Sequence, residues 1–205
     1  MTRKVPFENN EYYHVFNRGV EKRKIFLDEE DYLYFTHILK IFNDSARAEN
    51  VRYFYRSRTS IGLKSRNPLV EIISYSLLPN HYHFLIKQVS DGGISKFLQK
   101  IGTGYTHYFN KKYKRSGVLF QGKTKSKHVD TDKYLNYLKQ YIELNPLDLF
   151  QSKWKEGVKN KKEVVKFLNQ YKWKSPTRKD SGSSELFVLD EEFADFVKSI
   201  EVGLR

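Results

Sequence analysis

The stretch VEIISYSLLPNHYHFLI, residues 70–86, decides how this chain folds. Its first nine residues form a strongly apolar run, Pro79 and Asn80 follow, and the residues after the histidines are apolar again. Proline and asparagine favour turns, so the chain is expected to reverse direction at this pair. The stretch therefore predicts a β-hairpin whose strands occupy residues 69–78 and 81–89.

Two histidines open the second of these strands. His81 and His83 are separated by one residue, and residues i and i+2 of a strand face the same side of a sheet. Their imidazoles are therefore expected to project side by side, an arrangement that can hold one metal ion through two neutral nitrogens. The same spacing also suits two histidines that only form hydrogen bonds, and the spacing alone does not decide between these interpretations.

Further helices and strands are expected on both sides of the hairpin. The predicted strands are residues 12–16 and 51–55, the predicted helices are residues 29–43, 94–112 and 132–144, and residues 118–120 are a short extended piece followed by a basic loop. Asp28 is suited to cap the first helix, and Asp130 or Thr131 the last. Pro146 stops the last helix. This order predicts an α+β fold of the ferredoxin-like or RRM-like kind, an antiparallel sheet with helices packed on one face.

The composition of the chain changes after residue 150. Residues 1–150 are expected to form the main domain, and residues 151–205 a basic C-terminal extension. Within this extension, a Ser/Gly-rich linker covers residues 180–184, and a short acidic helix is expected at residues 191–200.

The chain is strongly basic, with a formal net charge of +13 over 205 residues. Residues 92–129 contain no acidic residue, and aromatic residues such as Tyr105 and Tyr108 are interleaved with the lysines. Positive charge combined with exposed aromatic rings is typical of a nucleic-acid surface, on which phosphates are neutralised and bases are stacked. A lysine-rich surface that serves only solubility would have the same composition.

Other features limit the class of protein. There is no cysteine, which excludes disulfides, thiolate catalysis and thiolate metal sites. No apolar stretch reaches the roughly 18 residues of a membrane span and no signal-peptide pattern is present, so a soluble, unexported, cytoplasmic protein is expected. The basic segments lack a clean apolar face, which disfavours binding to an acidic membrane.

A second group of candidate residues lies on the last predicted helix. Tyr141 and Asn145 are four residues apart and share one face of that helix, beside its buried stripe. The amide and the phenol could be presented together to a metal ion held by His81 and His83, the amide as a ligand and the phenol as a nucleophile. Core packing of the tyrosine and termination of the helix by the asparagine are the simpler alternatives.

Five segments, taken in order, resemble the single-tyrosine HUH transposases, which comprise insertion-sequence transposases and the REP-associated tyrosine transposases. The segments are YHVFNRG (residues 13–19), IF (25–26) with DY (31–32), LPNHYHFLI (78–86), LFQG (119–122) and YIELNP (141–146). YKWKS at residues 171–175 is a looser match to a Trp-Ser-Ser-like element found in many members. The resemblance covers about residues 11–150 and implies the HUH endonuclease fold.

The resemblance implies roles for individual residues. His81 and His83 match the metal-binding pair of the family, with Tyr82 in a middle position that is usually bulky and apolar. Tyr141 matches the catalytic tyrosine. Asn145 stands where members place a polar third ligand, often glutamine. The implied cofactor is a divalent ion, Mg²⁺ or Mn²⁺, which suits two imidazoles with oxygen ligands.

The resemblance also implies a reaction and a substrate. Single-stranded DNA, with an imperfect hairpin beside the cut site, is expected to be cleaved by the tyrosine, which gives a 5′-phosphotyrosine linkage and a free 3′-hydroxyl. Such an enzyme is expected to act at the nucleoid. The residues expected to contact the DNA backbone are Arg18, Lys96, Lys100, Lys111, Lys112, Lys114, Arg115, Lys123, Lys125 and Lys127.

Three alternatives stay open at this point. Tyr137 and Tyr141 are spaced like the paired tyrosines of some rolling-circle replication initiators, so an initiator with the same chemistry is one alternative. A domesticated, non-catalytic protein that binds DNA hairpins is another. The third concerns assembly, because insertion-sequence members act as homodimers and REP-associated members can act as monomers. The C-terminal extension favours the REP-associated group.

Overall fold

The computed structural model describes residues 6–45, 67–158 and 160–175. The strand predicted at residues 51–55, the linker at 180–184 and the helix at 191–200 lie outside the described residues. Within the described part of the chain, no helix combines the length and the hydropathy needed to cross a membrane.

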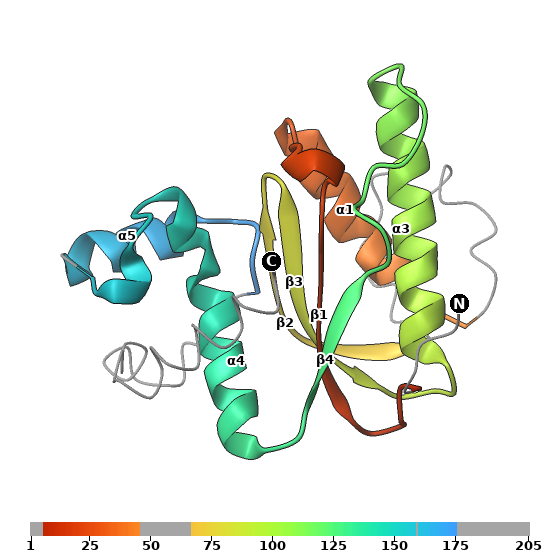
Figure 1. Cartoon of the computed structure of the whole chain (residues 1–205), viewed down its shortest axis with the longest axis horizontal. Coiled ribbons are helices and arrows are strands. Elements are labelled where there is room, and N and C mark those ends of the chain that lie inside the picture. The colour runs from red at the N-terminus through yellow and green to blue at the C-terminus, as the bar shows by residue number, and fades with distance from the viewer. Residues whose placement is uncertain (1–5, 46–66, 159, 176–205) are drawn as a thin grey trace.

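A four-stranded antiparallel sheet forms the centre of the fold (Figure 1). Its strands, in the spatial order β2-β3-β1-β4, are β1 (Tyr12–Arg18), β2 (Val70–Leu78), β3 (His81–Gln88) and β4 (Lys125–Val129). β2 and β3 form the predicted hairpin, in which Leu78 pairs with His81. β3 also pairs with β1, where Phe16 lies opposite His83. The predicted α+β class and antiparallel sheet are confirmed.

The prediction of a basic loop after residue 120 is wrong for residues 125–129, because these residues form β4. β4 pairs with β1 alone, so it is an edge strand, and three of its five residues are exposed. Its pairing runs from Lys125 opposite Phe16 to Val129 opposite Tyr12. Because backbone hydrogen bonds to β1 hold this strand, it needs no run of apolar residues, and lysines are common on exposed edges. The apolar pattern that marks a strand is therefore missing.

Two helices cover one face of the sheet. α1 (Glu29–Ile41) and α3 (Gly93–Lys112) contact each other and pack on this face (Figure 1). The buried side chains of this layer include Phe35, Phe97, Tyr105, Val15, Phe84 and Ile86. Gly104 allows the end of α1 to approach α3 closely, because a β-carbon at this position would lie 2.4 Å from the ring of Phe42.

α4 (Asp132–Leu144) packs against the opposite face of the sheet (Figure 1). Its buried residues Leu138 and Ile142 belong to one apolar cluster with Leu85 of β3 and Val129 of β4. The prediction that the helices pack on one face therefore holds for α1 and α3 and is wrong for α4. Alternate side chains of β3 enter the two layers, so both faces of the sheet have apolar surface to bury. The amphipathic α4 covers the second face.

Short helices and an added edge segment complete the described chain. They are η1 (Val20–Lys22), η2 (Asn145–Leu149), η3 (Trp154–Glu156) and α5 (Lys161–Gln170). Beyond α5, residues 171–175 lie along β2. The Leu77 N–H donates to the carbonyl of Trp173 at 2.9 Å, and the Ser175 N–H donates to that of Tyr75 at 2.9 Å. The first part of the C-terminal extension thus contacts the sheet, and a domain boundary at residue 150 stays a prediction.

Candidate active site

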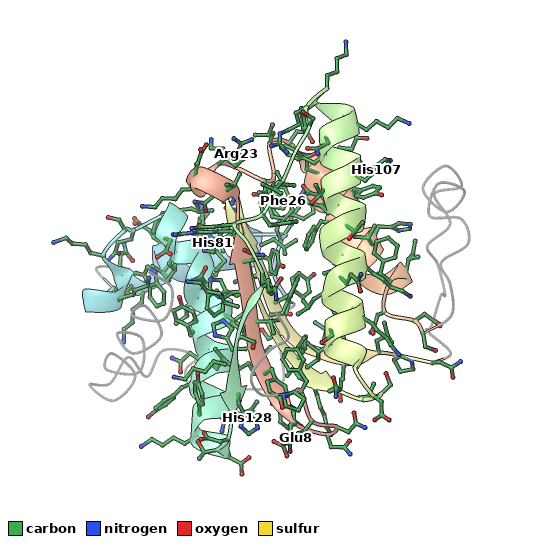
Figure 2. The ribbon with its side chains drawn as sticks, turned by 45° about the vertical axis from the view of Figure 1, so that its right-hand side comes forward. Glu8, Arg23, Phe26, His81, His107 and His128 are labelled. Carbon is green, nitrogen blue, oxygen red and sulfur yellow. The ribbon has the colours of Figure 1, made fainter. Side chains whose placement is uncertain are left out.

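The two histidines of β3 lie on the face of the sheet that α4 covers. Their ring centroids are 5.1 Å apart and their planes stand at 86°. Figure 2 shows His81 between the sheet and the segments that follow α4, on the far side of the sheet from α3, which carries His107. His81 is partly buried, and His83 is 1% exposed. The alternation of the strand therefore brings both imidazoles to one place.

Hydrogen bonds occupy the δ nitrogens of both histidines. Nδ1 of His81 lies 2.6 Å from Oδ1 of Asn80, and Nδ2 of Asn80 donates to the carbonyl of Lys22 at 3.4 Å. With the oxygen of Asn80 facing this ring, the tautomer of His81 that satisfies the hydrogen bond has its proton on Nδ1 and a lone pair on Nε2. Nδ1 of His83 lies 2.9 Å from Nε2 of His14, in a second and fully buried hydrogen bond.

Burial favours the neutral form of both imidazoles. It lowers the pKa of His83 well below its ordinary value, and the influence of His81 and His14 acts in the same direction. Burial also lowers the pKa of His81, against the opposing influence of the Asp148 carboxylate. The neutral imidazole is the form that ligates a metal ion, so both side chains are suited to ligation at neutral pH.

α4 brings Tyr141 against this pair of histidines. The helix begins after Thr131, one of the two candidate caps, whose hydroxyl accepts a hydrogen bond from the Tyr134 N–H. Tyr141, near the other end, is 1% exposed. Its ring centroid lies 5.7 Å from that of His83, with the two planes at 86°. The predicted nucleophile and the predicted ligands are therefore brought together by helix-on-sheet packing.

Asn145 ends α4 close to His81, whose pKa it helps to raise against the effect of burial. It is 1% exposed, and its Oδ1 is buried without a hydrogen-bond partner among the described residues. A buried acceptor that meets no donor is costly, and a cation held by His81 and His83 would satisfy it. This donor set fits a divalent ion, although the described residues contain no group of three or more His, Cys, Asp or Glu suited to a metal.

A cavity of about 480 Å³ connects these residues. Both histidines, Tyr141 and Asn145 line it. The charged residues in its wall are Arg18, Lys22, Lys125, Lys155 and Asp148, and its remaining lining comes from Phe16, Asn17, Asn80, Tyr82 and Gln121. Four basic side chains against one carboxylate give the cavity a positive potential, which suits a phosphate group.

Two of the ten basic residues predicted to contact DNA line the cavity, namely Arg18 and Lys125. Lys112 instead forms ion pairs of 2.8, 3.0 and 2.9 Å with Asp28, Glu30 and Asp31, which join the end of α3 to the start of α1. Lys100 and Arg115 are partly buried, and the exposed members of the set outside the cavity wall are Lys96, Lys111, Lys114, Lys123 and Lys127. For these residues, contact with DNA stays a prediction.

His14 is a site residue that the sequence argument does not identify. It is 1% exposed, and β1 places it on the same face of the sheet as His83. One signal was available, because His14 alternates with Val15 in a predicted strand and would face the other side of the sheet from it. The register between β1 and β3 is also needed to bring it to His83, and that register is a tertiary property.

Lys155 is a second such residue, and it comes from the C-terminal extension. Its neighbour Trp154 is fully buried, and the Trp154 indole N–H donates to Oδ1 of Asp148 at 2.8 Å. Nζ of Lys155 lies 3.4 Å from the same carboxylate oxygen and 6.0 Å from the ring centroid of Tyr141. No local pattern marks Lys155, because only the fold of η2 and η3 returns it to the cavity.

Tyr137, the alternative nucleophile, does not line the cavity. It is partly buried against the apolar cluster that α4 shares with α5, and Nζ of Lys133 lies 5.8 Å from its ring centroid. It lies one helical turn before Tyr141 and packs as an ordinary aromatic residue of the helix.

Comparisons with known proteins give four findings. Residues 53–145, which include His81, His83, Tyr141 and Asn145, match the model of the IS200-like transposase family. A solved structure of a REP-associated tyrosine transposase bound to a REP hairpin aligns at 15% identity and a TM-score of 0.54, covering 93% of this chain and 90% of that chain. A structure described as a candidate transposase from Deinococcus radiodurans R1 aligns at 12% identity and a TM-score of 0.39, covering 70% of this chain and 96% of that one. No curated protein sequence matches the chain.

Proposed function

We propose that this chain, whose residues 53–145 match the family of IS200-like transposases, cleaves and rejoins single-stranded DNA through a covalent bond to Tyr141. The family match supports a DNA-processing enzyme. The observation that carries the finer proposal is the convergence of Tyr141, His81, His83 and Asn145 on one basic cavity. Such a reaction needs a nucleophile, ligands for a metal ion and a basic surface that binds the phosphate.

In the proposed reaction, the phenol oxygen of Tyr141 attacks the phosphorus of the scissile link. The bond from phosphorus to the 3′ oxygen breaks, the 5′ phosphate stays on the tyrosine, and the leaving oxygen takes up a proton. A phenol ordinarily titrates near pH ~10, so positive charge close to it favours ionisation at neutral pH. The basic wall of the cavity supplies such charge. Rejoining is the reverse attack by a new 3′-hydroxyl, so the reaction needs no nucleotide cofactor.

His81, His83 and Asn145 are the residues that would hold a divalent ion, Mg²⁺ or Mn²⁺. An ion bound there would polarise the scissile phosphate and would stabilise the negative charge of the transition state. The protein's own contribution is to orient two imidazoles and one amide oxygen toward the cavity and to keep the imidazoles neutral. Tyr141 packs against His83, so the nucleophile lies beside the residues that would hold the ion.

The proposed substrate is single-stranded DNA with a hairpin beside the cut site. The fold resembles that of a transposase solved with a REP hairpin, and this likeness supports a hairpin substrate for the present chain. It also favours the REP-associated branch over the insertion-sequence branch, and with it a monomer that acts at the nucleoid in the cytoplasm.

A covalent-trapping assay tests the proposed function. Labelled single-stranded DNA from the flanks of the gene, hairpins included, is incubated with Mn²⁺ and the protein and is then separated on a denaturing gel. We expect a protein–DNA adduct that Tyr141→Phe abolishes and that His81→Ala and His83→Ala strongly reduce. Tyr137→Phe, one turn away on the same helix, is the matched control and should leave the adduct in place.

Two other outcomes would change the proposal. An adduct that survives in Tyr141→Phe and disappears in Tyr137→Phe would move the nucleophile and favour a replication initiator. Tight binding of the same hairpins without any adduct would favour a non-catalytic DNA-binding protein. The position of Tyr137 outside the cavity wall disfavours the first outcome, and the neutral histidine pair beside a buried, unsatisfied amide oxygen disfavours the second.

A further inference from the structure

A buried hydrogen bond joins His14 of β1 to His83 of β3. Nε2 of His14 lies 2.9 Å from Nδ1 of His83, and each side chain is 1% exposed. The two rings are nearly coplanar and meet edge to edge, with centroids 5.2 Å apart and planes at 18°, as an in-plane hydrogen bond requires. His14 therefore contacts a predicted metal ligand through its Nε2.

One of these two nitrogens must carry the proton of the hydrogen bond. Which of them carries it decides whether Nε2 of His83 can bind a metal ion. If His83 donates the proton from Nδ1, its Nε2 keeps a lone pair for a cation. If His14 is the donor, the proton of neutral His83 sits on Nε2, and that nitrogen cannot act as a ligand. The metal site proposed above requires the first arrangement.

We propose that His14 accepts the Nδ1 proton of His83 and thereby directs Nε2 of His83 toward the metal ion. This inference rests on the proposed function. His14 is a positioning residue, because it acts through His83. Metal-ligating histidines usually donate their second N–H to a neighbouring acceptor that fixes the ring. Asn80 lies in that position for His81, and Nε2 of His14 lies in the same position for His83.

The pairing of β1 with β3 fixes His14 in this role. Phe16 lies opposite His83 in the ladder, and His14 lies opposite Leu85. The ring of Phe16 also stacks on His83, with centroids 5.7 Å apart and planes at 28°. Two residues of β1 thus restrain the His83 ring, Phe16 by stacking and His14 by a hydrogen bond.

Two substitutions separate the hydrogen bond from packing. His14→Gln keeps an amide oxygen near the position of Nε2, so an acceptor for His83 is retained. His14→Leu fills the space without an acceptor. His107→Gln, on the exposed surface of α3, is the matched control. Melting temperatures without metal show whether each variant is folded.

The first measurement is the Mn²⁺ affinity of the full-length, metal-free protein by titration calorimetry in the absence of DNA. We expect His14→Leu to weaken this affinity by about 10–100-fold, the usual effect of losing such a supporting residue. His14→Gln should stay close to the wild type, and His107→Gln should equal it. Equal Mn²⁺ affinity in a folded His14→Leu protein and the wild type would overturn the assignment.

The second measurement needs no variant and keeps the assignment testable if His14→Leu folds poorly. Nitrogen NMR of wild-type protein labelled in its histidines reports which ring nitrogen carries the proton. We expect a protonated Nδ1 and an unprotonated Nε2 for His83 in the metal-free protein. A proton on Nε2 of His83 would refute the proposed role of His14.

These measurements distinguish the two proposals. If the wild-type protein binds no Mn²⁺, the metal-dependent reaction is contradicted, and the proposed role of His14 is contradicted as well. A wild-type protein that binds Mn²⁺ and forms the Tyr141 adduct, combined with an unaffected His14→Leu protein, contradicts only the role of His14.

Discussion

Asn145 holds the least satisfied polar atom of the site. Its Oδ1 is buried without a hydrogen bond of good geometry among the described residues, although Asn145 lies close enough to His81 to raise the pKa of that imidazole. An orphan acceptor of this kind lowers stability by about 1–3 kcal/mol unless a further group satisfies it. A divalent ion is such a group, and this gives a test that needs no DNA.

We expect Asn145→Ala to lower the affinity for Mn²⁺ by about tenfold or more, because one ligand is lost. The melting temperature without metal should stay the same or rise, since the substitution removes an unsatisfied acceptor. Both quantities follow from thermal melting with and without Mn²⁺. Asn136→Ala, exposed on the same helix, is the control. A full Mn²⁺-dependent shift in Asn145→Ala would show that the amide is not a ligand.

The buried histidines also set how stability depends on pH. Burial, with a smaller effect of Lys127, lowers the pKa of His14 to about 3, and burial lowers the pKa of His83 and His81 too. In the unfolded chain a histidine titrates near pH ~6.5. Below that pH the unfolded state takes up protons that the folded state excludes, so the free energy of unfolding falls as the pH falls.

We therefore expect the free energy of unfolding of the metal-free protein to fall by about 1.4 kcal/mol per pH unit below pH ~6.5 for each histidine that stays neutral in the folded state. Above neutrality, these histidines should not make the free energy of unfolding depend on pH. Urea unfolding at a series of pH values measures this slope. His14→Gln removes one of these histidines and should flatten the slope. A slope that is unchanged in His14→Gln would contradict the argument.

The sequence identifies the residues whose proximity depends on local spacing. His81 and His83 come from the period of a strand, and Tyr141 and Asn145 from the spacing of a helix. His14 depends on strand register, and the alternation of β1 indicates only the side of the sheet that it faces. Lys155 depends on the return of the chain after α4, and no local pattern marks it. Local spacing reveals the chemical groups of such a site, while the residues that orient them require the tertiary structure.

At the level of elements, the same limit explains the two corrections to the fold. β4 has no apolar alternation, because backbone hydrogen bonds to β1 hold it at an exposed edge. α4 has a clear apolar stripe, but the stripe does not say which face of the sheet it covers. That choice is made by Leu85 and Val129, which offer apolar surface on the side of the histidines. The packing of α4 on this face brings Tyr141 close to His81 and His83.

The short helix η3 gives a prediction of its own, because it delivers Lys155 to the cavity. A lysine that contacts a phosphate releases about one counterion on binding, so its loss reduces the salt dependence of DNA affinity. We expect Lys155→Gln to weaken the binding of single-stranded DNA and to lower the slope of log affinity against log salt by about 0.7. The measurement is fluorescence anisotropy at several salt concentrations in EDTA, which keeps it independent of the reaction.

Lys162→Gln is the comparison for Lys155→Gln, because Lys162 is exposed on α5 and does not line the cavity. It should leave the slope unchanged. If both substitutions lower the slope equally, the DNA follows the C-terminal helix and Lys155 has no special part in holding the scissile phosphate.

On the scale of the whole molecule, the basic residues differ in their surroundings: some form ion pairs within the protein and others line the cavity. The net charge is +13, yet Lys112 is engaged by three carboxylates at the junction of α1 and α3, on the face away from the histidines. The wall of the cavity, on the other face, combines four basic residues with one acidic residue. Charges separated by more than a Debye length of about 8 Å are largely screened at physiological salt, so position matters more than total charge.

The double substitution Arg18→Gln with Lys125→Gln tests this uneven use of charge. Both residues line the cavity, so we expect their loss to lower the salt slope for single-stranded DNA by about 1.4, the sum of two phosphate contacts. Lys96→Gln with Lys111→Gln removes the same charge from the exposed surface of α3 and should change the slope much less. Anisotropy titrations in EDTA compare the two proteins directly. An equal loss in both would show that the DNA continues from the cavity across α3, because only direct neutralisation of phosphates, and not the net charge of the protein, sets the slope.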